Sequence, residues 1–171
     1  MTYIDFDGTI LDTEEPLFYE WRRIPDYTNL SEETKIKYIQ SQDWNYIIKV
    51  SPIINDATYY LKHMDPAKSA ILTKVHSLSN EGAAKINWKK ENNIKQNMII
   101  VPYNVRKIDV VDARGNYLLD DGLWNLDEWN SVGGIPLFMD PDEDGYDPWG
   151  KPNINNYPKV KSLGEIYKYI L

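Results

Sequence analysis

Short apolar runs recur along the chain, each bounded by polar or turn-forming residues. They occupy residues 3–6, 70–73, 98–101, 117–119 and 135–138. Short continuous runs of this kind predict buried β-strands. The longer segments between them repeat apolar residues every three or four positions, which is typical of amphipathic helices. Strands that alternate with helices predict an α/β fold, with a parallel sheet of about five strands and helices on both faces.

The predicted helices occupy residues 14–27, 32–40, 43–50, 56–63 and 80–92, and a further one ends the chain. Ser31 is a suitable N-cap for the second of them and Ser79 for the fifth. Ser162 and Glu165 match a capping box before the last helix. Residues 140–156 are polar and rich in Pro, Gly and Asn, so they predict a long loop.

The segment between the first and second predicted strands is unusually long. Residues 14–50 carry helical patterns and exceed the length of an ordinary connection between a strand and the next element. We interpret this segment as a small helical insertion and not as an independent domain. The core is then expected to comprise residues 1–13 and 51–171.

The composition is ordinary for a globular protein and narrows the function. Of 171 residues, 42% are apolar and 26% are charged, and the net charge of −7 argues against a basic surface for duplex nucleic acid. The absence of cysteine excludes disulfides, thiolate metal sites and a cysteine nucleophile. Neither a leader sequence nor a membrane-spanning apolar run is visible, so a cytoplasmic protein without a membrane partner is expected.

The most distinctive chemistry follows the first apolar run. Asp5 and Asp7 lie at the end of this predicted strand, and Gly8 lets the main chain turn sharply and approach a ligand closely. Open α/β sheets bind their ligands at the carboxyl ends of strands. Two neighbouring carboxylates repel each other, and a hard divalent cation with oxygen ligands relieves that repulsion. An Asp-Gly turn without function is the simpler alternative.

Other strand ends carry reactive side chains as well. Thr73 ends the second predicted strand, Asp120 and Asp121 end the fourth, and Lys107 lies between the third and the fourth. In a parallel sheet these side chains would meet at the same edge as Asp5. Taken singly, they are a β-forming residue, a solvated turn and a surface lysine. Their joint occurrence behind the opening motif favours a functional site.

The opening motif resembles the signature of a known superfamily. The run Asp5-Phe6-Asp7-Gly8-Thr9-Ile10 is similar to the Asp-x-Asp-Gly-Thr-(Ile/Leu) signature of haloacid dehalogenase-like (HAD) proteins. A threonine, a lysine and an acidic pair follow in the order of that superfamily, so the resemblance extends over nearly the whole chain. It implies a HAD-like Rossmannoid three-layer fold, with a small helical cap inserted after the first strand.

The resemblance also implies a reaction, the hydrolysis of a phosphate ester through an aspartyl-phosphate. Asp5 is the expected nucleophile, and the Asp7 side chain is the expected general acid and base. Thr73 and the main-chain N–H groups of Phe6 and Asp7 would hold the phosphoryl oxygens. Lys107 would add a positive charge on the same group, and we include it with Thr73 among the catalytic residues.

A magnesium ion is the cofactor that the resemblance implies. Asp5 would supply one oxygen ligand, the main-chain carbonyl of Asp7 a second, and Asp121 a third. Asp120 would hold a metal-bound water or orient Lys107. The sequence leaves open which residue of the acidic pair contacts the metal directly.

Further substrate contacts are expected at the opening motif and in the cap. Gly8 and Thr9 join Phe6 as expected substrate-binding residues of the motif. Phe18 and Trp21 in the cap would stack on a nucleobase, and Trp44 and Tyr46 are weaker candidates because amphipathic spacing makes most such residues core. Arg106 is the alternative to Lys107, since the two basic residues are adjacent.

Several segments resemble the 5'-nucleotidase and deoxyribonucleotidase branch of the superfamily. They are residues 70–73, 85–88, 99–102, 118–121 and 133–138, together with Lys107. In that branch a Lys-x-x-Trp element follows the threonine strand. Residues 122–125, Gly-Leu-Trp-Asn, depart from the Arg-Pro of the branch, and the cap is short, so these departures concern the nucleoside specificity and not the phosphatase chemistry.

The sequence thus predicts a phosphatase for a small phosphorylated substrate, with a nucleoside monophosphate as the first choice, acting as a monomer or homodimer. A sugar phosphate or a nucleic-acid end is the alternative substrate. A non-catalytic phosphate-binding module on the same fold is the alternative function. Residues 140–145 also copy the opening of a calcium loop, but Lys151 stands where the loop needs a bidentate glutamate, so an acidic surface loop is the preferred interpretation.

Overall fold

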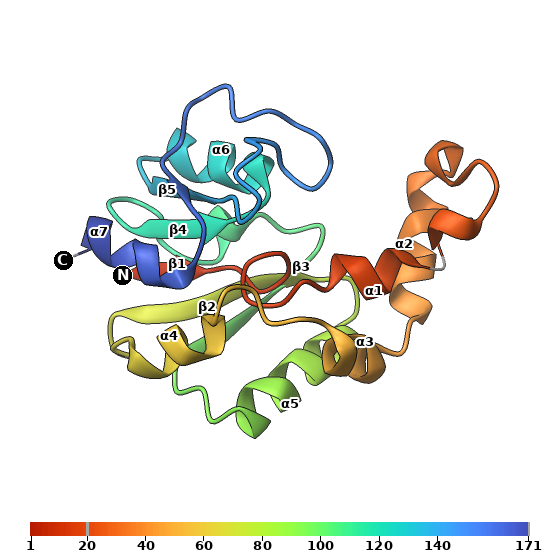
Figure 1. The fold of residues 1–171 in the computed structure, drawn as a ribbon, viewed down its shortest axis with the longest axis horizontal. Helices are drawn as coiled ribbons and strands as arrows, with labels where there is room; N and C mark the ends of the chain where they lie inside the picture. Colours follow the sequence, from red (N-terminus) through yellow and green to blue (C-terminus); the bar gives the residue numbers. More distant parts are fainter. Residues whose placement is uncertain (20, 171) are drawn as a thin grey trace.

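The computed structural model describes residues 1–19 and 21–170, and a parallel sheet runs through its centre (Figure 1). Within these residues the sheet has six strands in the order β3-β2-β1-β4-β5-β6, and every neighbouring pair is parallel. The strands are β1 (Thr2–Ile4), β2 (Ser69–Val75), β3 (Asn97–Pro102), β4 (Tyr117–Asp120), β5 (Ile135–Met139) and β6 (Lys159–Val160).

Helices connect the strands and cover the sheet. Between β1 and β2 lie α1 (Glu14–Tyr19), η1 (Trp21–Arg23), η2 (Tyr27–Asn29), α2 (Glu32–Ser41), α3 (Trp44–Val50) and α4 (Ala57–His63). The π-helix η3 (Leu78–Gly82) and α5 (Ala83–Glu91) follow β2, and the short η4 (Lys107–Asp109) follows β3. Helix α6 (Leu123–Ser131) follows β4, and η5 (Leu163–Ile166) with α7 (Tyr167–Ile170) ends the described chain.

The two faces of the sheet bury separate apolar clusters. Successive side chains of a strand point to opposite faces, so Ile4 packs with Ile71 and Leu119 on one face while its neighbour Tyr3 lies on the other. The first cluster is closed by residues of α3, α4, α5 and η5, and the second by residues of α6. On the second face the ring of Tyr3 meets that of Trp129 edge-on, with 5.4 Å between centroids. The result is a three-layer α/β/α arrangement.

The helical segment 14–50 projects from the carboxyl edge of the sheet, at the right of Figure 1. Ser31 caps α2, because its hydroxyl accepts a hydrogen bond from the Thr34 N–H at 3.2 Å. Asp43 caps α3 in the same way, accepting from the Tyr46 N–H at 3.1 Å. Helix α2 buries none of its residues, whereas α3 buries Trp44 and packs on α5. This segment therefore reaches the core through α3 and leaves α2 over the strand ends.

The structure corrects several predicted boundaries. The first helix ends at Tyr19 and gives way to η1, and the cap before α5 is Ser77 and not Ser79, since the Ser77 hydroxyl accepts from the Asn80 N–H. Ser162 makes no capping bond, and Glu165 accepts from the Lys161 N–H instead. Helix α6 and strand β6 were not predicted. Residues 20 and 171, which fall in the predicted first helix and in the predicted core, lie outside the described residues.

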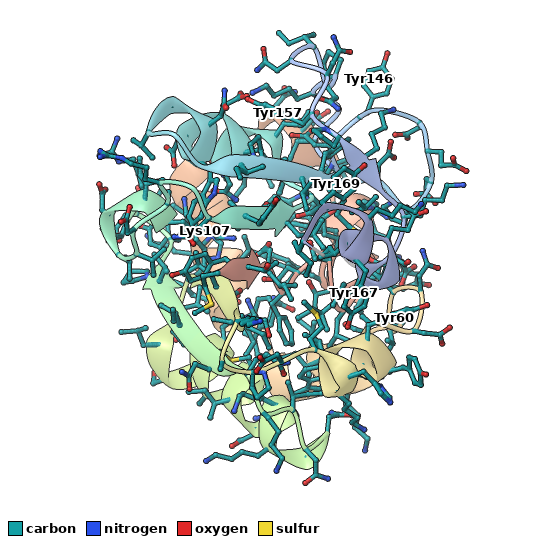
Figure 2. The ribbon with its side chains drawn as sticks, turned by 90° about the vertical axis from the view of Figure 1, so that its left-hand side faces the viewer. Tyr60, Lys107, Tyr146, Tyr157, Tyr167 and Tyr169 are labelled. Carbon is teal, nitrogen blue, oxygen red and sulfur yellow. The ribbon has the colours of Figure 1, made fainter. Side chains whose placement is uncertain are left out.

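The predicted loop 140–156 is confirmed as a long connection between β5 and β6. The first residue of its calcium-like sequence already has protein partners. The Asp140 carboxylate accepts a hydrogen bond from the Gly145 N–H at 3.1 Å and pairs with the Lys159 ammonium at 3.2 Å. Figure 2 shows Tyr146 standing out from this loop, whereas Tyr157 lies closer to the sheet and is buried. The loop is thus folded back onto the molecule.

Candidate active site

The candidate site lies where the strand order reverses. Strand β1 is central, with β2 on one side and β4 on the other, so the connections after β1 and β4 diverge from a single point at the carboxyl edge. Ligands of open α/β sheets bind at such a switch point. Asp5 follows β1 directly and continues its ladder, since its N–H donates to the Leu119 carbonyl at 2.9 Å. This bond fixes the main chain that carries the opening motif.

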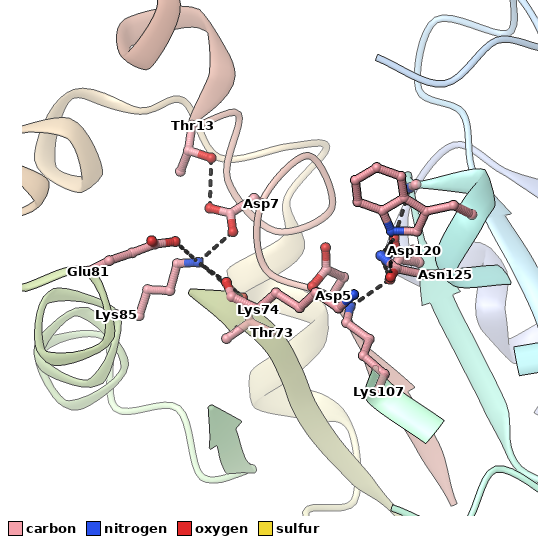
Figure 3. A network of polar contacts seen from close by, with 12 residues as sticks. Asp5, Asp7, Thr13, Thr73, Lys74, Glu81, Lys85, Lys107, Asp120 and Asn125 are labelled. Carbon is pink, nitrogen blue, oxygen red and sulfur yellow. Dashed lines mark hydrogen bonds and ion pairs between the residues drawn. The ribbon is translucent and has the colours of Figure 1, made fainter. Parts of the chain in front are cut away.

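A buried lysine joins two carboxylates at this point. The Lys107 ammonium donates to Asp5 Oδ1 at 2.7 Å and to Asp120 Oδ2 at 2.6 Å (Figure 3). Asp120 also accepts from the Gly122 N–H at 2.8 Å and from the Asn125 amide at 3.1 Å. Both oxygens of Asp120 therefore accept hydrogen bonds, and in this arrangement Asp120 holds Lys107 against Asp5.

Asp121 completes an acidic group that suits a divalent cation. Carboxylate oxygens of Asp5, Asp120 and Asp121 lie within 4.8 Å of one another, and all three residues are buried. Burial raises the pKa of Asp121 well above its ordinary value, and the charges of Asp120 and Asp5 add to that effect. Hard carboxylate oxygens are the ligands that Mg2+ accepts, and a cation here would relieve the repulsion that Lys107 only partly offsets. The residues present thus fit a magnesium ion.

Gly8 brings the turn after β1 against Asp121. Its φ of +64° lies in the left-handed region, where residues with a side chain are strained. A Cβ added at this position would lie 1.7 Å from Asp121 Oδ2. Gly8 therefore lets the main chain lie close to the Asp121 carboxylate, whereas its predicted approach to a ligand stays a prediction.

The Asp7 carboxylate points away from the acidic group, toward α5. Its Oδ1 accepts from the Thr13 hydroxyl at 2.7 Å, and its Oδ2 accepts from the Lys85 ammonium (Figure 3). The two aspartates of the motif therefore face different partners: Lys107 holds Asp5, and Lys85 holds Asp7. The expectation that the main-chain carbonyl of Asp7 binds the metal stays a prediction.

Lys85 is fully buried and organises a second polar group. Its ammonium lies 2.8 Å from Glu81 Oε1, 3.1 Å from the Thr73 hydroxyl and 3.1 Å from the Lys74 carbonyl. Burial acts to lower the pKa of Lys85, but the charges of Asp7 and Glu81 outweigh it and raise the pKa. The lysine is therefore charged, and the Thr73 hydroxyl is bound to it in this conformation.

The electrostatics of the first group favour a site completed by a cation. Burial raises the pKa of Asp5 to about 7, with Asp120 and Asp7 adding to the rise and Lys107 opposing it. Burial would lower the pKa of Lys107, yet Asp120 and Asp5 raise it well above its usual range. A charged lysine thus sits beside carboxylates that burial and mutual repulsion push toward protonation. A second positive charge would favour their ionised forms.

A cavity of about 950 Å3 opens over these groups. Its floor includes Asp5, Asp7, Lys107 and Asp121, and its roof is the helical segment 14–50. Aromatic and apolar side chains line the roof, namely Leu17, Phe18, Trp21, Ile36, Ile39 and Trp44. This volume falls within the usual range of small-molecule sites.

Known proteins resemble this chain in structure and not in sequence. No family model and no curated protein matches the sequence. A HAD hydrolase of family IA, variant 3, from Entamoeba histolytica aligns with a TM-score of 0.65 at 13% identity, over 96% of this chain and 94% of that chain. The HAD-hydrolase YfnB from Bacillus subtilis, bound to magnesium, gives a TM-score of 0.57 at 13% identity, over 98% and 96%. A haloacid dehalogenase-like family hydrolase from Streptococcus pneumoniae gives a TM-score of 0.61 at 12% identity, over 99% of this chain and 97% of that chain.

The chain has a HAD-like Rossmannoid fold. The predicted fold class is thereby confirmed, with a sheet one strand larger than the predicted five. At identities of 12–13% the likeness concerns the fold, so the reaction has to be inferred from the site of this HAD-like chain. None of the helices in the described part of the chain has the length and apolar character needed to span a lipid bilayer.

The HAD-like fold brings most of the expected site residues together. Lys107 is buried at the acidic group, whereas Arg106 is exposed and pairs with Asp109 at 2.8 Å, so the geometry favours Lys107 of the two adjacent cations. Phe18 and Trp21 both line the cavity. Their role toward a substrate stays a prediction.

Other expected residues lie deeper than the sequence suggested. The side chains of Phe6 and Thr9 are fully buried, and the Phe6 ring packs edge-on against Trp88. Neither residue lines the cavity, and their contacts with a substrate stay a prediction. Trp44 lines the cavity but is mostly core, and its indole N–H donates to the Ile39 carbonyl, while Tyr46 is exposed and lies outside the lining.

Sequence reasoning missed several residues of the site. Glu81 and Lys85 stand four positions apart, the spacing of a helical ion pair, and this signal would have marked their helix as polar on one face. Thr13 holds Asp7, and Asn125 donates to Asp120 from the first turn of α6. Asn125 was hard to recognise because α6 itself was not predicted.

Proposed function

We propose that this HAD-like chain is a Mg2+-dependent phosphomonoester hydrolase that acts through an aspartyl-phosphate, with nucleoside monophosphates as its substrates. The observation that carries the proposal is the pairing of Asp5 with the buried Lys107 in the wall of the cavity. Asp7, two residues further on, has a separate set of partners. These separate partners support Asp5 as the attacking carboxylate and Asp7 as the group that transfers protons.

In the first step a carboxylate oxygen of Asp5 attacks phosphorus, and the bond from phosphorus to the alcohol oxygen breaks. Lys107 keeps Asp5 in place through Oδ1 and lies next to the transferred group, where its charge would stabilise the added negative charge. Asp7 in its protonated form gives its proton to the leaving oxygen. For this duty its carboxyl has to exchange Lys85 for the substrate.

In the second step Asp7, now ionised, takes a proton from water. The water oxygen bonds to phosphorus, the bond from phosphorus to Asp5 breaks, and inorganic phosphate leaves. Asp7 is then protonated again, the form that the next turnover needs, and Thr13 keeps its carboxyl in position. Asp5 and Asp121 would hold the magnesium ion, while Asp120 orients Lys107. When bound, the ion would neutralise charge between Asp5 and the phosphate.

The roof of the cavity supports a nucleoside as the leaving group. Residues 14–50 would act as a cap on a core of residues 1–13 and 51–171, and they present Phe18 and Trp21 to the cavity. Aromatic side chains stack on nucleobases without strong sequence preference. A sugar phosphate would make less use of such a roof. A non-catalytic module would have no use for Asp7 with its two dedicated partners.

The proposal is tested by measuring phosphate release from p-nitrophenyl phosphate and from a panel of nucleoside monophosphates, with Mg2+ and with a chelator. We expect turnover that needs the metal and that falls by at least about a thousandfold in Asp5→Asn. Asp26→Asn makes the same chemical change in an exposed turn and serves as the control. Full activity in Asp5→Asn, or no turnover of any ester by the parent protein, would rule the proposal out.

A further inference from the structure

Lys74 lines the cavity, and it has no role in the proposed reaction. It follows Thr73 on β2, and its side chain extends toward the end of the sheet where Asp5 lies (Figure 3). Its ammonium lies 5.8 Å from the centroid of the Trp124 ring. Among the hydrogen bonds and ion pairs between described residues, none involves this ammonium group, whereas Lys107 and Lys85 each bind two carboxylates.

A half-buried ammonium without a direct acidic contact favours an anionic ligand. Burial lowers the pKa of Lys74, and the more distant charges of Glu128, Asp120 and Asp5, which raise it, do not fully compensate. An anion in contact with the ammonium would restore the lost solvation. Because β2 alternates its side chains, Thr73 and Lys74 point to opposite faces, so the ammonium lies on the side of α6 and not beside Lys85.

Beside Lys74 the cavity wall is formed by two parallel tryptophans. Trp124 lies in the first turn of α6 and Trp149 belongs to the loop before β6. Their rings stack with 5.3 Å between centroids and 12° between planes. Although both line the cavity, 53% of Trp124 and 58% of Trp149 remain exposed. The Trp124 ring is fixed in orientation, since its indole N–H donates to Asn125 Oδ1 at 2.7 Å. Exposed, fixed aromatic surface next to an unpaired cation is typical of a ligand-binding wall.

We propose that Lys74 and the Trp124–Trp149 pair form a subsite for the leaving group of the substrate. Lys74 would bind a second phosphate there, and the tryptophans would contact a flat ring of the substrate next to it. This inference rests on the proposed hydrolase activity and extends its substrates to esters that carry a second phosphate group. A nucleoside 3',5'-bisphosphate combines the second phosphate with a flat base, and a sugar bisphosphate offers the phosphate alone. The subsite is built from β2, α6 and the loop before β6, and so lies opposite the helical segment 14–50.

The test compares pairs of substrates that differ by one phosphate. The kcat/KM of deoxyadenosine 3',5'-bisphosphate is divided by that of the 5'-monophosphate, and the same ratio is taken for fructose 1,6-bisphosphate and fructose 6-phosphate. A charge-assisted hydrogen bond to phosphate predicts that Lys74→Gln lowers these ratios by roughly tenfold or more. Lys62→Gln removes one charge from the exposed side of α4 and should leave them unchanged. Equal losses on mono- and bisphosphates in Lys74→Gln would place Lys74 at the transferred group and overturn the proposal.

A binding measurement separates this inference from the proposed reaction. The dissociation constant of the nucleoside bisphosphate is measured with Mg2+ for Asp5→Asn and for the double variant that also carries Lys74→Gln. It should be higher for the double variant, whether or not the parent protein turns over any ester. Trp149→Ala should weaken binding of the nucleoside bisphosphate by roughly fivefold or more and leave the sugar bisphosphate unchanged. An unchanged dissociation constant in Lys74→Gln would refute the subsite, and an equal effect of Trp149→Ala on both ligands would refute the ring contact. A failure of turnover with intact binding would refute only the hydrolase.

Discussion

At the scale of single residues, the site separates two aspartates by giving each its own lysine. Lys107 bridges Asp5 to Asp120, and Lys85 bridges Asp7 to Glu81. The residues of the motif are close in sequence, but their partners come from separate parts of the chain. A buried lysine that loses its carboxylate is strongly destabilised, so each pair fixes one aspartate in a defined position. In the proposed reaction these different surroundings would allow Asp5 to attack and Asp7 to transfer a proton.

Gly8 gives a sharp test of the acidic group at this scale. In Gly8→Ala the new Cβ would collide with Asp121, so the carboxylate has to move and the affinity for Mg2+ should fall by at least about tenfold. The left-handed φ adds a loss of roughly 1–2 kcal/mol in the free energy of unfolding. Both effects are measured on the purified protein, by calorimetric titration with Mg2+ and by urea denaturation.

Gly115→Ala is the matched control for this change. Gly115 has a φ of +71°, and a Cβ there would meet nothing within 4 Å. Gly115→Ala should therefore show the loss of stability from the left-handed φ alone, and only Gly8→Ala should bind Mg2+ more weakly. Equal Mg2+ affinities in the two variants would show that Asp121 is not a metal ligand.

At the scale of elements, α6 does more than cover the sheet. Asp127 on this helix accepts from Tyr157 Oη at 2.6 Å and from the Asn155 amide at 2.8 Å, and it pairs with Lys151. These bonds tie the loop between β5 and β6 to α6. Because Trp149 belongs to the same loop, the aromatic wall of the cavity depends on this attachment.

The attachment predicts a pH-dependent contribution to stability. Burial raises the pKa of Asp127, but hydrogen bonds from Lys151, Tyr157 and Asn155 outweigh it and hold the pKa below its ordinary value. Since the folded state binds this proton less readily, the stabilisation is present above the unfolded pKa of about 3.9 and is lost as the pH falls through the folded value. Asp127→Asn should lower the melting temperature at pH 7, and the difference from the parent should shrink below about pH 4.

Asp142→Asn provides the control, because it removes a carboxylate from an exposed position in the same loop. It should leave the melting temperature nearly unchanged across this range. A constant difference between Asp127→Asn and the parent at every pH would mean that the Asp127 charge does not hold the loop.

The elements themselves were largely predictable, and the failures have physical causes. Apolar runs marked β1 to β5 because buried parallel strands need little else, and Ser31 marked the start of α2 through its side-chain oxygen. Strand β6 is two residues long and too short to show a pattern. Helix α6 follows the acidic pair directly and starts at Gly122 without a side-chain cap. Its sequence therefore lacks the usual signal of a helix start.

At the scale of the whole molecule, the helical segment 14–50 turns an open sheet edge into a cavity. Trp21 is buried within this segment and also lines the cavity. Its ring centroid lies 4.5 Å from that of Tyr38 and 6.3 Å from that of Phe18. It therefore has both a packing role and access to a ligand. The relative weight of the two roles decides whether this roof selects the substrate.

Trp21→Ala separates these roles. If the roof stacks on a base, the KM for nucleoside monophosphates should rise by roughly tenfold, with a smaller change for glycerol phosphate, which has no ring. Tyr46→Ala removes an exposed aromatic side chain from α3, outside the cavity, and should change neither KM. Equal effects of Trp21→Ala on both substrates would mean that Trp21 acts only through packing.

The sequence by itself determined where five of the strands and most of the helices lie along the chain, because short-range patterns record burial and turn formation. It also indicated that carboxylates, a hydroxyl and a lysine follow or end these strands. It placed Asp5, Asp7 and Asp121 at one edge of a parallel sheet. Only the tertiary structure decided which partner each one meets. Lys85 reaches Asp7 across 78 positions of the chain, and Lys107 reaches Asp5 across 102. Such contacts depend on how helices rotate and pack against the sheet, and no local pattern encodes that rotation.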